Sequence, residues 1–115
     1  MAVEIFHNPR CSKSRQTLAL LQEKGIDPDV TEYLTSPPTK ERLTEILEML
    51  HMQPRELMRK GESEYKDNNL GDPALSDDAL IKAMIDHPKL IERPIVITNG
   101  KARIGRPPES VLEIL

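Results

Sequence analysis

Apolar residues near the start of the chain follow first a strand-like and then a helix-like spacing. Residues 3–6 are mostly apolar and stop shortly before Pro9, which lacks the N–H that a strand ladder needs. Residues 12–24 place leucines at helical spacing, and Gly25 is a natural C-terminal stop. A further strand-like run at residues 30–34 precedes two prolines. The pattern therefore predicts a strand, a helix and a second strand, which together form a βαβ unit.

The middle of the chain carries only helical patterns. Residues 39–49 gather leucines and an isoleucine on one face, and residues 54–70 indicate shorter helical pieces. Ser76, followed by two aspartates, is a favourable helix start, because its side chain can accept a hydrogen bond from a free backbone N–H. That helix is expected to run toward His87. We therefore predict a helical insertion over about residues 39–88.

The last quarter of the chain predicts a hairpin and a final helix. Residues 94–98 and 101–104 are strand-like runs joined by Asn-Gly, the dipeptide most typical of a tight hairpin. Residues 107–115 begin with two prolines, which the first turn of a helix tolerates. A βαβ unit followed by a ββα unit is the thioredoxin arrangement. The predicted fold class is thus α/β: a single thioredoxin-like domain over residues 1–115, with a four-stranded mixed sheet and the helical insertion.

Composition and charge exclude several classes of function. The chain has 115 residues, of which 37% are hydrophobic and 30% charged, and this suits one soluble domain. With one Phe, two Tyr, no Trp and a net charge of -3, we expect no nucleic-acid binding. The N-terminal apolar run is too short for a signal peptide, and no run approaches the roughly 20 residues that span a bilayer. We expect a cytoplasmic protein, without membrane contact, and a monomer.

Cys11 is the one cysteine of the chain, so no internal disulfide can form. It lies where the first strand passes into the first helix, and the free N–H groups of a helix N-terminus favour a thiolate. A lone cysteine can also be an inert apolar filler, but this position favours a nucleophile beside an anion site. Arg15, one helical turn away, is the preferred anion ligand, and His7 is a candidate for tuning the cysteine pKa. The hydroxyls of Ser12 and Ser14 are candidates for binding an oxyanion in the same turn, and Arg10 and Lys13 can add positive potential there.

Four segments spread over the chain carry a recognisable pattern. They read HNPRCSKSR at residues 7–15, ELMRK at 56–60, LIERPIV at 90–96 and IGRP at 104–107. In this order they resemble the glutaredoxin-linked arsenate reductases, and the first loop resembles that of the family's chromosomal branch. The plasmid-borne branch usually has glycine and threonine at the two positions after the cysteine, where this chain has serine and lysine.

The resemblance implies a covalent redox mechanism on Cys11. The thiolate would attack arsenic(V) of arsenate, glutathione would attack the adduct, glutaredoxin would remove the glutathione, and arsenite would leave. Arg59, Arg93 and Arg106 match the family's oxyanion-binding arginines, and Pro94 matches its cis proline. The resemblance requires no metal and no bound cofactor: glutathione is a co-substrate and glutaredoxin a protein partner.

Two other functions remain open. Residues 11–14, CSKS, have the form of a monothiol glutaredoxin site, so the chain could act on glutathione mixed disulfides. Transcription regulators of the same fold bind RNA polymerase and sense oxidation, but they usually carry a second cysteine where this chain has Ser14, and they lack the arginines. His51 and His87 have no partners at metal-ligand spacing and are interpreted as structural.

Overall fold

The computed structural model describes residues 2–115, which divide into two compact units. The first unit contains the chain up to Ser36 together with Arg93–Leu115, and the second contains Pro37–Glu92. The second unit covers the predicted helical insertion and extends a few residues beyond it at both ends. Met1, the first residue of the predicted domain and of the run tested for a signal peptide, lies outside the described residues.

The first unit contains a four-stranded sheet in the order β2-β1-β3-β4. β1 pairs in parallel with β2 and antiparallel with β3, and β3 pairs antiparallel with β4. The sheet is therefore mixed, and the thioredoxin-like arrangement predicted from the sequence is confirmed. The strands are β1 (Val3–Phe6), β2 (Asp29–Thr31), β3 (Ile95–Thr98) and β4 (Lys101–Ile104).

β2 is shorter than the sequence predicted. The strand ends at Thr31, and the chain then turns, because the N–H groups of Thr35 and Ser36 both donate to the Glu32 carbonyl at 3.1 and 3.0 Å. Tyr33, which was expected inside the strand, instead buries its ring against Phe6, with ring centroids 6.3 Å apart. The apolar residues after β2 thus serve packing rather than pairing.

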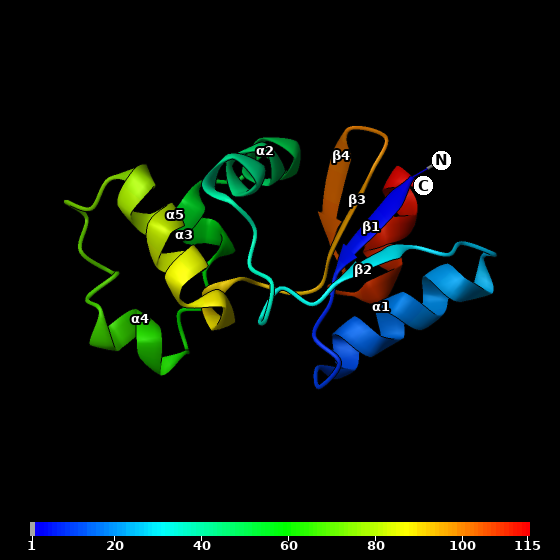
Figure 1. Cartoon of the computed structure of the whole chain (residues 1–115), viewed down its shortest axis with the longest axis horizontal. Helices are drawn as coiled ribbons and strands as arrows, with labels where there is room; N and C mark the ends of the chain where they lie inside the picture. The colour runs from blue at the N-terminus through cyan, green and yellow to red at the C-terminus, as the bar shows by residue number, and fades with distance from the viewer. Residues whose placement is uncertain (1) are drawn as a thin grey trace. The chain divides into compact units, whose positions relative to one another are not determined.

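One face of the sheet is covered by α1 (Ser12–Glu23) and η2 (Pro108–Ile114), as Figure 1 shows. η2 is the predicted final helix, and its hydrogen bonds follow the tighter 3₁₀ pattern, for example from the Leu115 N–H to the Leu112 carbonyl. Burial of aliphatic side chains from both helices and two strands holds this layer together. The core comprises Val3, Ile5, Leu21, Val96, Val111 and Ile114.

The second unit is helical, as predicted. Thr39 and Ser76 cap α2 (Lys40–Leu50) and α5 (Asp77–Asp86), the two longest helices of this unit, by accepting hydrogen bonds from the N–H groups of Arg42 and Ala79. No helix within residues 2–115 is long and apolar enough to cross a membrane. The other elements are α3 (Pro54–Leu57), α4 (Ser63–Asp67) and η1 (Pro88–Leu90).

The sheet topology brings three chain segments together at one end of the strands in the first unit. Because β1 and β2 are parallel and β3 runs the opposite way, the ends of β1 and β2 meet the start of β3. The loop that leads to Cys11 leaves β1 at this end of the sheet. Glu32 follows β2 there, and Arg93 lies just before β3. At the opposite end of the strands, Asn99 and Gly100 form the predicted hairpin turn, with positive φ of 55° and 71°.

Candidate active site

Cys11 is the N-cap residue of α1, as the sequence predicted, and its backbone is extended. The Cys11 N–H donates to the Asn8 carbonyl, and the Arg15 N–H donates to the Cys11 carbonyl, both at 3.0 Å. These two bonds fix the turn between β1 and the helix. The thiol therefore lies beside the first-turn N–H groups of α1, where a helix stabilises negative charge.

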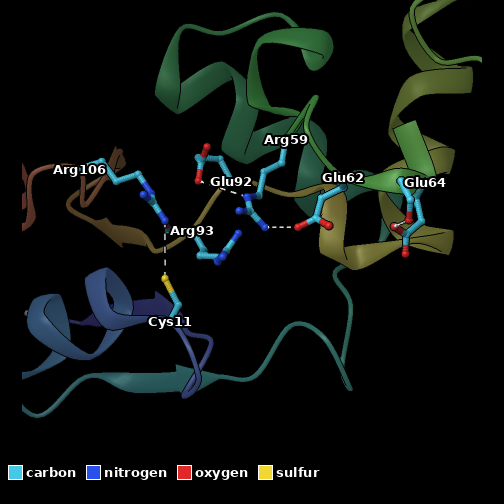
Figure 2. Close-up of polar contacts among 8 residues, drawn as sticks. Cys11, Arg59, Glu62, Glu64, Glu92, Arg93 and Arg106 are labelled. Carbon is cyan, nitrogen blue, oxygen red and sulfur yellow. Dashed lines mark hydrogen bonds and ion pairs between the residues drawn. The ribbon is translucent and has the colours of Figure 1, made fainter. Parts of the chain in front are cut away.

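The Cys11 sulfur lies among donors of positive potential. Burial raises the pKa of the thiol, since the residue is only 7% exposed. The N–H groups of Ser14 and Lys13 and the Arg93 guanidinium act in the opposite direction and outweigh burial, so the pKa lies below its ordinary value. Arg106 Nη2 also approaches Sγ, at 3.6 Å (Figure 2). This environment suits a reactive thiolate and not an inert apolar filler.

Arg93 and Arg106 meet because they lie at the two ends of the β3–β4 hairpin. Arg106 Nε donates to the Arg93 carbonyl at 2.7 Å, and Nε and Nη1 of Arg93 are buried. The Arg93–Pro94 peptide bond is cis, the conformation expected for Pro94. The structure thus brings Cys11, Arg93 and Arg106 together, and both guanidinium groups lie next to the sulfur.

Gly105 allows the segment that carries Arg106 to lie close against α1, and sequence reasoning missed this role. A Cβ at Gly105 would lie 2.5 Å from Thr17 Oγ1 and 2.8 Å from Pro94 Cγ. The Gly105 N–H also donates to the Pro94 carbonyl at 3.0 Å. The available signal was the glycine directly before an arginine in the IGRP segment, but only the folded chain shows which residues the glycine must approach.

Ser14 and His7 form a buried hydrogen-bonded pair at the base of the loop. Ser14 Oγ lies 2.6 Å from His7 Nδ1 and accepts the Asn8 N–H at 3.0 Å. The Ser14 hydroxyl is therefore engaged within the protein, whereas its main-chain N–H is directed at Cys11. Burial lowers the pKa of His7, against the effect of Glu32. The imidazole is thus mostly neutral at pH 7 and contacts Ser14, so a direct tuning of Cys11 by His7 stays a prediction.

Arg15 ties the loop to the helix. Its side chain is exposed, and Nη1 donates to the Pro9 carbonyl at 3.0 Å. Arg10 is exposed as well, and its N–H donates to Asn8 Oδ1 at 3.0 Å. The expected role of Arg15 as an anion ligand stays a prediction.

Arg59 belongs to the second unit and lies between two carboxylates there. Its Nη1 contacts Glu62 in a short ion pair, and its Nε is 3.8 Å from Glu92 Oε1 (Figure 2). The Arg59 N–H donates to the Leu90 carbonyl at 2.7 Å, which fixes the backbone after α3. These contacts hold the guanidinium in one orientation, and its role toward an oxyanion stays a prediction.

Comparison with known proteins decides the family of the chain. Residues 6–114 match the model of the ArsC family. The chain belongs to the ArsC family. It is 60% identical to the uncharacterized protein YfgD of Escherichia coli, over 98% of this chain and 96% of that protein. It is also 51% identical to the arsenate reductase of Haemophilus influenzae, over 100% of both.

Solved structures of ArsC proteins share this fold. The arsenate reductase from Vibrio cholerae superposes with a TM-score of 0.98 at 59% identity, covering 100% of this chain and 98% of that chain. The resemblance to the arsenate reductase family is thus confirmed, and the assignment to its chromosomal branch stays a prediction. Within residues 2–115 of this ArsC chain, no group of three or more His, Cys, Asp or Glu side chains could hold a metal ion. His51 and His87 are C-cap residues of α2 and α5, in agreement with structural roles.

Proposed function

We propose that this ArsC chain reduces arsenate to arsenite, with Cys11 as nucleophile and with glutathione and glutaredoxin as electron donors. The observation that carries the proposal is the Cys11 sulfur, which lies against Arg93 and Arg106 and has a lowered pKa. A tetrahedral oxyanion held by these two guanidinium groups would have its central atom within reach of the sulfur. The arsenate reductases among the relatives support arsenate as that oxyanion.

The reaction begins with attack of the Cys11 thiolate on arsenic(V). An arsenate oxygen leaves as water, and the arsenic remains in its +5 state in the adduct. The thiol of glutathione then displaces a second oxygen as water. A glutaredoxin thiolate attacks the glutathione sulfur and forms a mixed disulfide, and the two electrons of the broken As–S bond pass to arsenic. Water finally releases arsenite, and Cys11 leaves as the thiolate.

The residues around Cys11 act on charge in this scheme. Arg93 and Arg106 balance the negative charge of the bound oxyanion, and the first-turn N–H groups of Ser14 and Lys13 stabilise the thiolate before attack and after release. Because Cys11 is the only cysteine, the reducing thiol must come from another molecule. We place the reaction in the cytoplasm, where glutathione is kept reduced, and propose that a monomer performs it.

The test is a coupled assay of arsenate reduction. The purified chain is incubated with arsenate, glutathione, glutaredoxin, glutathione reductase and NADPH, and arsenite and NADPH are both measured. We expect arsenite to form in proportion to NADPH consumed, and Cys11→Ser to abolish its formation while the far-UV circular dichroism is unchanged. A wild-type chain whose thiol reacts readily with iodoacetamide but which produces no arsenite would exclude arsenate as its substrate.

The reduction of glutathione mixed disulfides is a second candidate function. A lone thiol with a lowered pKa and Ser14 in place of a second cysteine favours it. Arsenate and a glutathionylated peptide should be compared as substrates at equal enzyme concentration. Turnover of the peptide alone would assign this second function.

A further inference from the structure

A second pocket lies on the β2 side of the Cys11 loop. It is lined by residues 7–10 of the loop and by Glu32, Leu34 and Thr35 from the turn after β2, and its volume is about 270 Å³. Arg93, by contrast, precedes β3 on the other side of β1. The loop that carries the nucleophile therefore has an arginine site on its β3 side and this pocket on its β2 side. The reaction steps described above assign no role to the side chains of Arg10 or Glu32 in this pocket.

The pocket carries one fixed charge of each sign. Glu32 and Arg10 are both exposed, and among residues 2–115 neither side chain forms an ion pair or a hydrogen bond. Their backbones are nevertheless held in place. The Glu32 carbonyl accepts hydrogen bonds from Thr35 Oγ1 and from the N–H groups of Thr35 and Ser36, and the Arg10 N–H donates to Asn8 Oδ1. A ligand with both an ammonium and a carboxylate would complement this pair.

We propose that this pocket binds the γ-glutamyl end of glutathione, an inference that rests on the glutathione-dependent reaction proposed above. That end carries an ammonium and a carboxylate on the same carbon atom, the first for Glu32 and the second for Arg10. The pocket volume is close to the lower limit of about 300 Å³ for small-molecule sites, which suits one end of a tripeptide. Leu34 and Pro9 supply apolar lining for the methylene groups of the γ-glutamyl chain.

The position of the pocket allows the glutathione thiol to reach Cys11. Residues 7–10 lead directly into the cysteine, and an extended tripeptide spans at most about 10 Å. With its γ-glutamyl end between Glu32 and Arg10, glutathione would extend along the loop toward the sulfur. The donor thiol and the oxyanion would then approach Cys11 from different sides of β1, so that both can be bound at once.

Thiol–disulfide exchange tests the pocket without arsenate. The Cys11 thiolate attacks one sulfur of glutathione disulfide, a new Cys11–glutathione disulfide forms, the original S–S bond breaks, and one glutathione leaves as thiolate. Bis(2-hydroxyethyl) disulfide undergoes the same exchange but carries no charge. The ratio of the two rate constants, measured by mass spectrometry at one pH, reports recognition of the glutathione moiety independently of the reactivity of Cys11.

We expect Glu32→Gln and Arg10→Gln each to lower this ratio about fivefold to tenfold, the size of one lost charge-assisted contact. Glu23→Gln is the matched control. It removes an exposed carboxylate at the other end of α1, about 18 Å from Cys11 along the helix, and should leave the ratio unchanged. The two pocket variants change exposed residues on different segments. The rate-constant ratio of one variant can therefore be measured even if the other variant is poorly folded.

The outcomes separate this inference from the proposed function. Folded Glu32→Gln and Arg10→Gln variants with the wild-type ratio would overturn the glutathione pocket, even if arsenate reduction is intact. A lowered ratio in both variants, together with a wild-type chain that produces no arsenite, would support the pocket and reject arsenate as the substrate.

Discussion

At the scale of single residues, the Cys11 thiol is governed by two opposing effects. Burial favours the neutral thiol, and the donors around the sulfur favour the thiolate. The net effect is a lowered pKa, because the N–H groups at the helix N-terminus and the Arg93 guanidinium act on the same sulfur atom from different elements. Sequence reasoning located the helix N-terminus correctly, but it found Arg93 and Arg106 only through the family resemblance. Nothing in the local pattern shows that a hairpin more than 80 residues away returns to the loop.

The first prediction concerns the pH dependence of Cys11 alkylation. Because the pKa lies below that of an ordinary thiol, the thiolate forms at lower pH, and the iodoacetamide reaction should exceed that of an unfolded cysteine peptide below about pH 8.5. Arg93→Ala removes a contribution that lowers the pKa, so the pH profile should move to higher pH. Lys101→Ala, beside the hairpin turn at the opposite end of the strands, is the control and should leave the pH profile unchanged. An unshifted Arg93→Ala profile would contradict the assigned effect.

The second prediction concerns the Ser14 hydroxyl. Ser14→Ala removes the hydrogen-bond partner of His7 Nδ1 and of the Asn8 N–H inside a buried loop base. We expect a loss of about 1–3 kcal/mol in the free energy of unfolding, measured by urea denaturation, and slower alkylation of Cys11. The exposed Ser12 offers a matched control, since Ser12→Ala should cost less than about 0.5 kcal/mol. Equal losses for the two variants would show that the buried pair has no special role.

Ser14 also shows a limit of reading residues from sequence. Its hydroxyl was expected to face an anion, because it lies near the cysteine and at the start of a helix. The structure instead directs the hydroxyl to His7, seven positions earlier in the sequence. Of the Ser14 polar groups, the main-chain N–H is the one that donates to the Cys11 sulfur. Sequence proximity identified the correct segment, but the choice of partner depends on how the end of β1 packs against α1.

At the scale of elements, the chain was predicted well where capping and turn residues are strong. Ser76 and the hairpin turn at Asn99 appear where they were expected, and Thr39, which was expected to begin its helix, is the N-cap residue just before α2. β2 was predicted too long, because Tyr33 has high strand propensity but finds a better packing partner in Phe6. In β2, packing of Tyr33 against Phe6 thus outweighs strand propensity after Thr31.

The third prediction tests the close contact between the Arg106 segment and α1. In Gly105→Ala, the new methyl group would overlap Thr17 Oγ1 and Pro94 Cγ, so we expect destabilisation of about 1–3 kcal/mol and a higher KM for the oxyanion. Gly61→Ala is the control, because a Cβ at Gly61 meets nothing within 4 Å. In the double variant with Thr17→Ala, part of the stability should return, as a double-mutant cycle in chemical denaturation would measure. Additive losses would argue against a direct contact.

At the scale of the whole molecule, the chain combines a sheet unit with a helical unit. The predicted insertion at about residues 39–88 corresponds to the second unit, Pro37–Glu92. Helical periodicity was enough to predict α2 and α5, which have buried apolar faces and side-chain N-caps, whereas α3 and α4 were expected only as shorter helical pieces. The pairing of Arg59 with Glu92 could not be predicted, because Glu92 is distant in sequence and is brought beside Arg59 by the bridge between Met58 and Ile91.

The fourth prediction concerns Arg59, which lies in the helical unit and to which the resemblance assigns oxyanion binding. If Arg59 binds the oxyanion as the resemblance implies, Arg59→Ala should raise the KM for arsenate about tenfold, the size of one lost charge-assisted contact. Lys60→Ala, next in sequence, is the control and should leave KM unchanged. Steady-state kinetics at varied arsenate and saturating glutathione would measure both values. An Arg59→Ala variant with the wild-type KM would assign the arginine a purely structural role with Glu62 and Glu92.

The N-cap position of Cys11 has a consequence for how the protein returns to its resting state. A sulfur whose anionic form is stabilised by the start of α1 is a good leaving group as well as a good nucleophile. A neutral adduct on Cys11 removes that negative charge from the helix end, so it is disfavoured relative to the free thiolate. We therefore expect a neutral adduct on Cys11 to be released readily, because its departure restores the stabilised thiolate at the start of α1.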